Sequence, residues 1–252
     1  MKIDFHVHSS ASNDGTASYC HIAQAAAAVG LDAVCVCDHN HVGLTKPVFM
    51  EGVWLLPGCE ISSQGAHVLG ILIDERLNVD EYDKNNMPPI EESIEKIHAA
   101  GGLAVVAHPF AHPGSEISED ELASKHPDGI ESANARAWMR YPDANDRAAA
   151  FASSDLNVFV TGGSDAHLKD EIGNAYTLLD CDISGKNDEE VRSIIKEALL
   201  AKKSESVLVT NTKRIYKGYS QLERRNRSGR TSKKLVGVAY LCKCWFLDLL
   251  KK

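Results

Sequence analysis

Short apolar runs recur along most of the chain, and many are rich in Val, Ile and Leu. Such runs are typical of parallel strands that are covered on both faces. The run at 66–73 follows its predecessor closely, so these two strands are expected to form a local hairpin. We expect strands at residues 2–8, 33–38, 53–60, 66–73, 103–108, 129–133, 157–162 and 175–180.

Helical patterns fall between these strands. We expect helices over residues 19–29, 144–151 and 189–200, and another that begins near Ile90 and stops at Gly101-Gly102. Repeated strand–helix units predict an α/β fold with a parallel barrel. In such barrels the chemistry lies at the carboxyl ends of the strands.

Ionisable residues gather where the predicted strands end. Side chains alternate between the two faces of a strand, so Asp4, His6 and His8 share one face of the first strand. The same period places Asp165 and His167 side by side after the strand at 157–162. Further ionisable residues occur in or after the other apolar runs: Asp14, Asp38, His39, Glu60, His67 and His108.

This set of side chains indicates a chemical function as well as a fold. One histidine at a strand end is more often a hydrogen-bonded or surface residue than a ligand. Together, imidazoles and carboxylates suit zinc, manganese and iron(II), and there are enough of both for two or three ions. The pattern favours an open hydrolytic centre over a structural zinc site, which is usually a closed set of four Cys and His.

Composition agrees with a compact enzyme. The chain has 252 residues, 44% of them hydrophobic and 25% charged, which suits one large α/β domain. Residues 1–4 run directly into the first strand without an apolar leader, so we expect a cytoplasmic protein. Seven scattered cysteines indicate reduced thiols. For Cys35-Val36-Cys37 we favour core packing over zinc binding.

Charge divides the chain near residue 212. Residues 213–252 hold twelve Lys and Arg against two acidic residues, whereas residues 1–212 hold 15 basic and 33 acidic residues. We therefore expect a domain over 1–212 and a basic tail over 213–252.

The tail itself has two parts. Residues 217–234 are highly charged and predict a solvated linker. Leu235–Leu250 is apolar but shorter than the roughly 20 residues of a membrane span, so we expect an interfacial or docking helix. It either packs on the barrel or, with the basic run, binds an anionic membrane, nucleic acid or a partner protein. Removal of residues 217–252 is expected to leave the active site assembled.

Seven short motifs occur in one order along the chain: His6-Val7-His8-Ser9, Ser12-Asn13-Asp14-Gly15, Cys37-Asp38-His39-Asn40, Gly58-Cys59-Glu60, His67-Val68-Leu69-Gly70, Val106-Ala107-His108-Pro109 and Gly163-Ser164-Asp165-Ala166-His167. They resemble those of the PHP (polymerase and histidinol phosphatase) superfamily, above all its small stand-alone metal-dependent phosphoesterases, over residues 1 to about 180. The resemblance implies a distorted (β/α)7 TIM-like barrel with two or three divalent ions, Zn, Mn or Fe.

The same resemblance implies a distribution of ligands. His6, His8, Glu60 and Asp165 would hold one ion. Glu60 would bridge to a second ion held by His67 and His108. Asp14, His39 and His167 would hold a third. Asp4 and Asp38 are expected to orient ligand imidazoles, although Asp38 could equally be an ordinary strand-end cap.

The implied reaction is hydrolysis of phosphate monoesters by a metal-bound hydroxide, which makes the protein a phosphatase. Nucleotides, nucleoside bisphosphates and histidinol-phosphate-like esters are the expected substrates. Arg136 is expected to clamp phosphate and, with His167, to act in catalysis. Asn134 and His112 are expected to contact substrate, and Arg140 is a weaker candidate.

Two other classes stay open. Some PHP proteins are nucleases or protein-tyrosine phosphatases, and the basic tail favours nucleic acid while the acidic body opposes it. A non-catalytic metal-binding partner domain is disfavoured because the ligand set is full. The stretch between His67 and His108 is too short for the insertion that caps the pocket of nucleotide-specific relatives, so we expect an open pocket.

Overall fold

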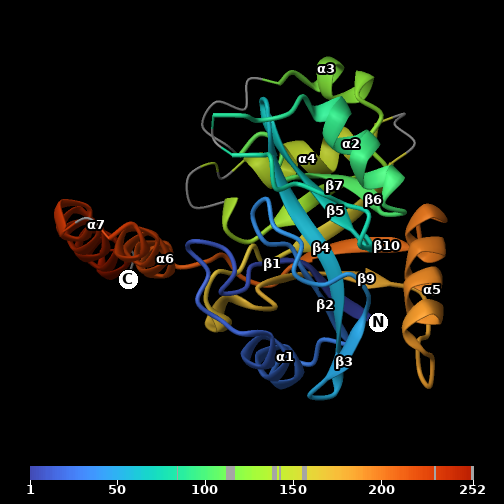
Figure 1. Cartoon of the computed structure of the whole chain (residues 1–252), viewed down its shortest axis with the longest axis horizontal. Coiled ribbons are helices and arrows are strands. Elements are labelled where there is room, and N and C mark those ends of the chain that lie inside the picture. Colours follow the sequence, from blue (N-terminus) through green and yellow to red (C-terminus); the bar gives the residue numbers. More distant parts are fainter. Residues whose placement is uncertain are drawn as a thin grey trace.

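The computed structural model describes residues 1–83, 85–111, 117–137, 141, 143–154, 158–229 and 231–250. Its centre is a ten-stranded mixed sheet with helices around it (Figure 1). The strands are β1 (Lys2–Val7), β2 (Ala33–Val36), β3 (Val48–Met50), β4 (Val53–Ser63), β5 (Ala66–Ile71), β6 (Leu103–Ala107), β7 (Gly129–Asn134), β8 (Phe159–Gly163), β9 (Ala175–Leu179) and β10 (Ser204–Leu208). The helices are α1 (Tyr19–Ala28), α2 (Ile90–Ala99), α3 (Glu119–Ser124), α4 (Ala144–Ala152), α5 (Asp188–Leu200), α6 (Arg214–Arg227) and α7 (Thr231–Leu249).

The sheet curls into a nearly closed barrel. Its order is β10-β9-β1-β2-β4-β5-β6-β7-β8, and a parallel bridge from Val7 to Ala166 brings the end of β8 back to β1. β1, β2 and β4 are parallel, as are β6, β7 and β8. β5 is antiparallel to both of its neighbours, and the expected β4–β5 hairpin is confirmed. The fold is thus the predicted α/β distorted barrel, with some strands reversed.

The barrel strands bury apolar side chains on both faces. Ile3 and Phe5 are fully buried and belong to one apolar cluster with Cys35 and Cys37. The two thiols lie 3.7 Å apart inside that cluster, so the interpretation of this pair as core packing is confirmed. The apolar packing fixes the strands whose polar residues form the site described below.

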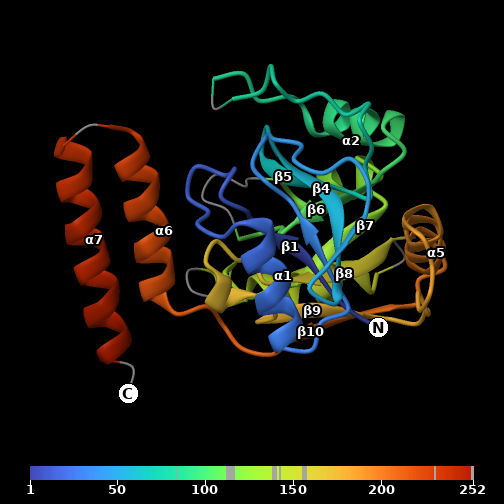
Figure 2. The ribbon, with the colours of Figure 1, turned by 60° about the horizontal axis from the view of Figure 1, so that its bottom comes forward.

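The C-terminal segment differs from its prediction. Residues 217–234 are not a solvated linker, because α6 covers most of them and pairs with α7 as an antiparallel helical hairpin beside the barrel (Figures 1 and 2). The apolar helix expected at 235–250 begins earlier, at Thr231. No helix in the described part of the chain is both long and apolar enough to cross a membrane.

Small residues and one cap explain why the charged segment folds. Gly218 of α6 is buried, and a Cβ there would lie 2.9 Å from the Leu241 side chain and 3.1 Å from its Cα, so glycine favours this close approach. The Asp248 carboxylate accepts the backbone N–H groups of Arg214 and Ile215 at 3.2 and 2.8 Å, which satisfies the first turn of α6. A helix that is polar overall is therefore held by a narrow contact face.

Candidate metal centre

The nine expected ligands converge at one end of the barrel. β1 carries His6 and is followed by His8, Glu60 lies within β4, and His108 follows β6. His67 is near the start of β5, and because β5 is antiparallel, its start lies at the end of the barrel where the parallel strands finish. The other members come from the segments after β1, β2 and β8: Asp14, His39, Asp165 and His167.

Glu60 is the central residue of this cluster. Its Oε1 lies 2.8 Å from Nδ1 of His67 and 3.2 Å from Nε2 of His108. Oε1 also lies 3.6 Å from Nε2 of His6, and Oε2 lies 2.6 Å from Nδ1 of His39 and 3.5 Å from Nε2 of His8. A single buried carboxylate therefore contacts five imidazoles from four segments of the chain.

Two aspartates complete the cluster. Oδ1 of Asp165 lies 3.4 Å from Nε2 of His8 and 3.5 Å from Nδ1 of His167. Oδ1 of Asp14 lies 3.5 Å from Nε2 of His167 and 3.7 Å from Nε2 of His39. Asp165 and His108 have positive φ angles of 54° and 30°, a strained backbone state that is common at functional sites.

Hydrogen bonds on the outer side fix how three of the imidazoles point. Nδ1 of His6 lies 3.0 Å from Oε1 of Glu131, and since an ionised carboxylate only accepts, this Nδ1 carries the proton. The Ser12 hydroxyl donates to Asp38 at 2.6 Å and so accepts from Nδ1 of His8 at 3.1 Å. Nδ1 of His167 donates to the backbone oxygen of Asp165 at 2.9 Å. Each ring therefore presents Nε2 to the cluster.

The expected orienting groups are only partly the observed ones. The Asp4 carboxylate accepts the backbone N–H groups of His6, Ser164 and Gly173, and no described imidazole is bonded to it. Burial raises the pKa of Asp4 to about 6. Asp38 acts on His8 through Ser12, whereas Glu131 contacts His6 directly. Glu131 was not predicted as a site residue, although an acidic residue inside an apolar strand was an available signal.

The charges of the site are strongly coupled. Burial alone would raise the pKa of Glu60, but the surrounding His67, His39 and His6 hold it well below its ordinary value. Burial would lower the pKa of His39, yet the charges of Glu60 and Asp14 outweigh it and raise the pKa to about 9. Burial, together with the charge of Arg136, lowers the pKa of His167 well below its usual range.

The donor set suits divalent cations. Nε2 of His6 and Nε2 of His8 lie only 3.1 Å apart, so without a cation one of them must hold a proton between them. The buried Oδ1 of Asp14 accepts no hydrogen bond from the described residues. Three-residue groups able to hold an ion are His8–His39–His167, His6–His108–Asp165, His6–His8–Glu60 and Glu60–His67–His108.

The expected substrate residues have other partners. The Arg136 guanidinium is buried and donates to both carboxylate oxygens of Glu171 at 3.2 Å and to the Ser220 hydroxyl at 3.3 Å. The amide of Asn134 donates to Glu131 and accepts the backbone N–H groups of Arg136 and Ala137. His112 and Arg140 lie outside the described residues. The substrate roles of all four stay predictions.

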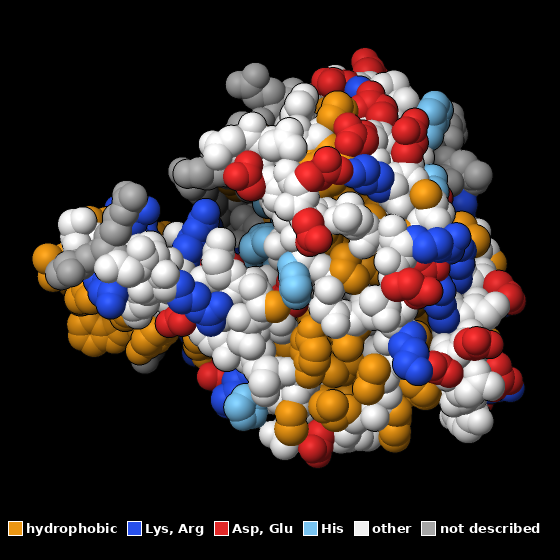
Figure 3. Space-filling view, in the orientation of Figure 1, with side chains coloured by type: hydrophobic (Ala, Val, Ile, Leu, Met, Phe, Trp, Pro, Cys, Tyr) orange, Lys and Arg blue, Asp and Glu red, His pale blue; other side chains and the backbone are white. Residues whose placement is uncertain are grey.

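A cavity of about 230 Å³ opens above the cluster. Its lining includes His67, His108 and Arg136 from the barrel, and Lys217, Gln221 and Arg224 from α6. In Figure 3, histidines lie near the centre of the visible face, with basic side chains between them and the hairpin. The mouth is therefore bordered by α6 and not fully open as expected. These three α6 residues were not predicted as part of the site, because their segment was expected to be a solvated linker.

A nearly closed α/β barrel with histidines and carboxylates at one end defines a class of metal-dependent hydrolase-like folds. The PHP domain family matches residues 4–133, and a PHP-associated family matches residues 142–198. The chain belongs to the PHP family. The helical hairpin lies beyond both matched regions.

Similar proteins leave the substrate open. MJ1587, an uncharacterised protein of Methanocaldococcus jannaschii, is 31% identical over 149 residues, which cover 54% of this chain and 82% of that protein. PsfC from Pseudomonas syringae has 17% identity and a TM-score of 0.63, with 90% of this chain and 98% of that chain covered.

Two further solved structures are larger proteins. A two-domain Bacteroides vulgatus protein containing a predicted PHP-like metal-dependent phosphoesterase has a TM-score of 0.60 and 19% identity, and covers 82% of this chain. The lesion-specific endonuclease EndoQ from Pyrococcus furiosus has a TM-score of 0.54 and 21% identity, and covers 78% of this chain. The chain spans 64% and 56% of their lengths, respectively. At these sequence identities the comparison shows a similarity of fold alone.

Proposed function

We propose that this protein is a metal-dependent phosphatase that hydrolyses monoesters of small phosphorylated molecules. The observation that carries the proposal is the convergence of imidazoles on the buried Glu60, with acceptors fixed behind two of them, His6 and His8. Zinc, manganese or iron(II) ions bound by these side chains would lower the pKa of water and neutralise charge on the transferred phosphoryl group.

The ligands proposed for these ions are the nine residues of the cluster. The donor chemistry supports two or three ions, because Glu60 has contacts on both carboxylate oxygens and Asp14 and Asp165 lie on different sides of His167. The nine proposed ligands are His6, His8, Asp14, His39, Glu60, His67, His108, Asp165 and His167.

The proposed role of the rest of the site is to orient the ester. Lys217 and Arg224 border the mouth and would attract an anionic substrate. Arg136, held by Glu171, contributes fixed positive charge near the cluster instead of a mobile clamp. The small cavity above the cluster favours a compact ester over a protein side chain on a folded surface.

A substrate panel tests this proposal. Full-length protein loaded with manganese is assayed with p-nitrophenyl phosphate, bis(p-nitrophenyl) phosphate and a single-stranded oligonucleotide. We expect the monoester to be hydrolysed at least about tenfold faster than the diester, with loss of activity after chelation and recovery on adding manganese, zinc or iron(II). Faster cleavage of the diester or the oligonucleotide would instead identify a nuclease. Full activity in metal-free protein would contradict the metal dependence.

A further inference from the structure

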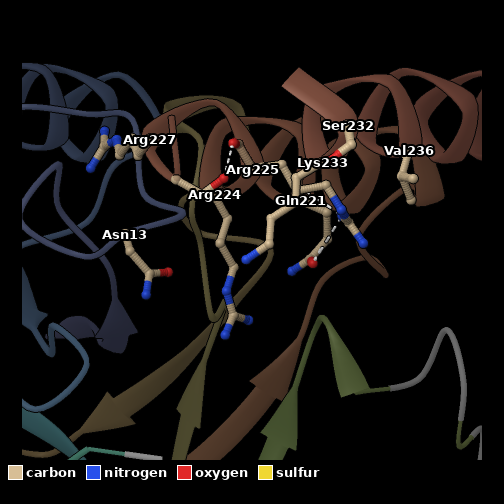
Figure 4. A pocket seen from close by; sticks show the side chains of 9 residues that line it. Asn13, Gln221, Arg224, Arg225, Arg227, Ser232, Lys233 and Val236 are labelled. Atoms are coloured by element: carbon tan, nitrogen blue, oxygen red, sulfur yellow. Dashed lines mark hydrogen bonds between the residues drawn. The ribbon is translucent and has the colours of Figure 1, made fainter. Parts of the chain in front are cut away.

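A second cavity of about 710 Å³ lies between the hairpin and the loop after β1 (Figure 4). Asn13 lines it on the barrel side, and side chains of α6, α7 and their connection line the other. Four of its lining residues are cationic and none is acidic. The lining comprises Asn13, Gln221, Arg224, Arg225, Arg227, Ser228, Ser232, Lys233 and Val236.

Two of the four cations build the walls of this cavity. Arg227 donates to the backbone oxygens of Ser10, Ser12 and Gly15 at 2.8–2.9 Å, which ties α6 to the loop that carries Asp14. Arg225 donates to the backbone oxygen of Gln221 at 3.1 Å. The cavity is thus a built part of the molecule and not a gap between two independent pieces.

The other two cations are available to a ligand. Arg224 and Lys233 are exposed, and neither forms an ion pair or hydrogen bond with a described residue. Figure 4 shows the Arg224 side chain extending from α6 on the side where Asn13 lies. Ser232 and Lys233 belong to the first turn of α7, where the helix dipole favours an anion.

The basic cavity adjoins the candidate metal centre. Gln221 and Arg224 line both this cavity and the one above the histidine cluster. An extended ligand could therefore place one group at the cluster and a second group between Arg224 and Lys233. Guanidinium groups match phosphate oxygens in pairs, and several cations without a carboxylate suit a dianion better than a carboxylate monoanion.

We propose that the hairpin cavity binds a second phosphate group of the substrate, so that the protein prefers esters with two phosphates to those with one. This inference rests on the proposed phosphatase function, because the first phosphate is the one that the metal centre hydrolyses. The hairpin, which lies outside both regions matched by the family, acts as the part of the chain that selects the substrate.

Hydrolysis of a matched substrate pair tests the selection. The probes are 1,6-hexanediol bisphosphate and 6-hydroxyhexyl phosphate, which differ by the second phosphate. We expect Lys233→Gln to lower the ratio of their kcat/KM values about five- to tenfold, the loss of one charge-assisted contact. The control is Lys234→Gln, which removes the same charge from the next, exposed residue outside the lining and should leave the ratio unchanged. Equal ratios in the two variants would overturn the assignment.

A binding experiment separates this inference from the proposed function. Calorimetric titration of the full-length variants with 1,6-hexanediol bisphosphate in excess chelator needs no hydrolysis. Weaker binding by Lys233→Gln than by Lys234→Gln supports the cavity even if no ester is hydrolysed. Equal bisphosphate affinity in the two variants overturns it. The assignment is also overturned if Lys233→Gln weakens binding of a single-stranded oligonucleotide but not of the bisphosphate, because the cavity would then bind a nucleic-acid backbone.

Discussion

At the scale of single residues, the site depends on acceptors that fix three of its imidazoles. Glu131 shows this most clearly, because it accepts from Nδ1 of His6 and from the backbone N–H of His108 at 2.8 Å. Period-2 alternation was enough to predict that His6 and His8 share a face. It could not indicate Glu131, because β1 and β7 are distant in sequence. Only the closed barrel brings the side chains of His6 and Glu131 into contact.

Replacing Glu131 should weaken metal binding without unfolding the protein. In Glu131→Gln the amide still fills the space but no longer holds His6 as a carboxylate does, so metal affinity should fall about 10- to 100-fold. Competition with a metal-binding dye measures this change. Glu189→Gln, an exposed change on α5, is the control. Identical affinities in the two variants would remove Glu131 from the support of the site.

The Arg136–Glu171 pair should contribute mainly to stability. Both side chains are buried, and Glu171 also accepts the backbone N–H of His167 at 3.1 Å. Arg136→Met leaves a buried carboxylate unpaired and should lower the free energy of unfolding by roughly 3 kcal/mol. Adding Glu171→Gln should restore part of that loss in a double-mutant cycle measured by urea denaturation. Purely additive effects would show that the pair is not coupled.

At the scale of elements, the barrel was more predictable than its attachments. All eight expected strands occur, because buried strands carry strong apolar runs. β3 and β10 were not predicted; each is short, and Ser204–Leu208 has little apolar content. α6 was misinterpreted because charge alone argued for a linker, whereas Gly218 and the Asp248 cap provide the contacts that a composition cannot reveal.

The link from α6 to the Asp14 loop should be measurable as local order. Arg227→Gln removes donors from the carbonyls of Ser10, Ser12 and Gly15. Amide hydrogens in residues 10–15 should then exchange faster, while those in β1 keep their protection. Hydrogen exchange by mass spectrometry checks this, with Lys234→Gln as the matched charge control. Unchanged exchange in the loop would mean that Arg227 does not order it.

At the scale of the whole molecule, an acidic barrel carries a basic hairpin at the mouth of its site. The buried apolar clusters of the described barrel include no residue beyond Leu199. Deletion of residues 213–252 should therefore leave a cooperatively folding protein that still binds metal. It should also lose the preference for bisphosphates. Thermal unfolding and metal analysis of the truncated chain check the first part; loss of the cooperative transition would show that the hairpin belongs to the core.

The most direct test of the metal centre is elemental analysis of Glu60→Gln beside the unaltered protein, with monoester hydrolysis measured on the same samples. Glu60 contacts five rings from four segments, so the uncharged amide should remove most of the bound metal and nearly all of the activity while the fold is retained. Full metal content and turnover in Glu60→Gln would contradict the account at its centre.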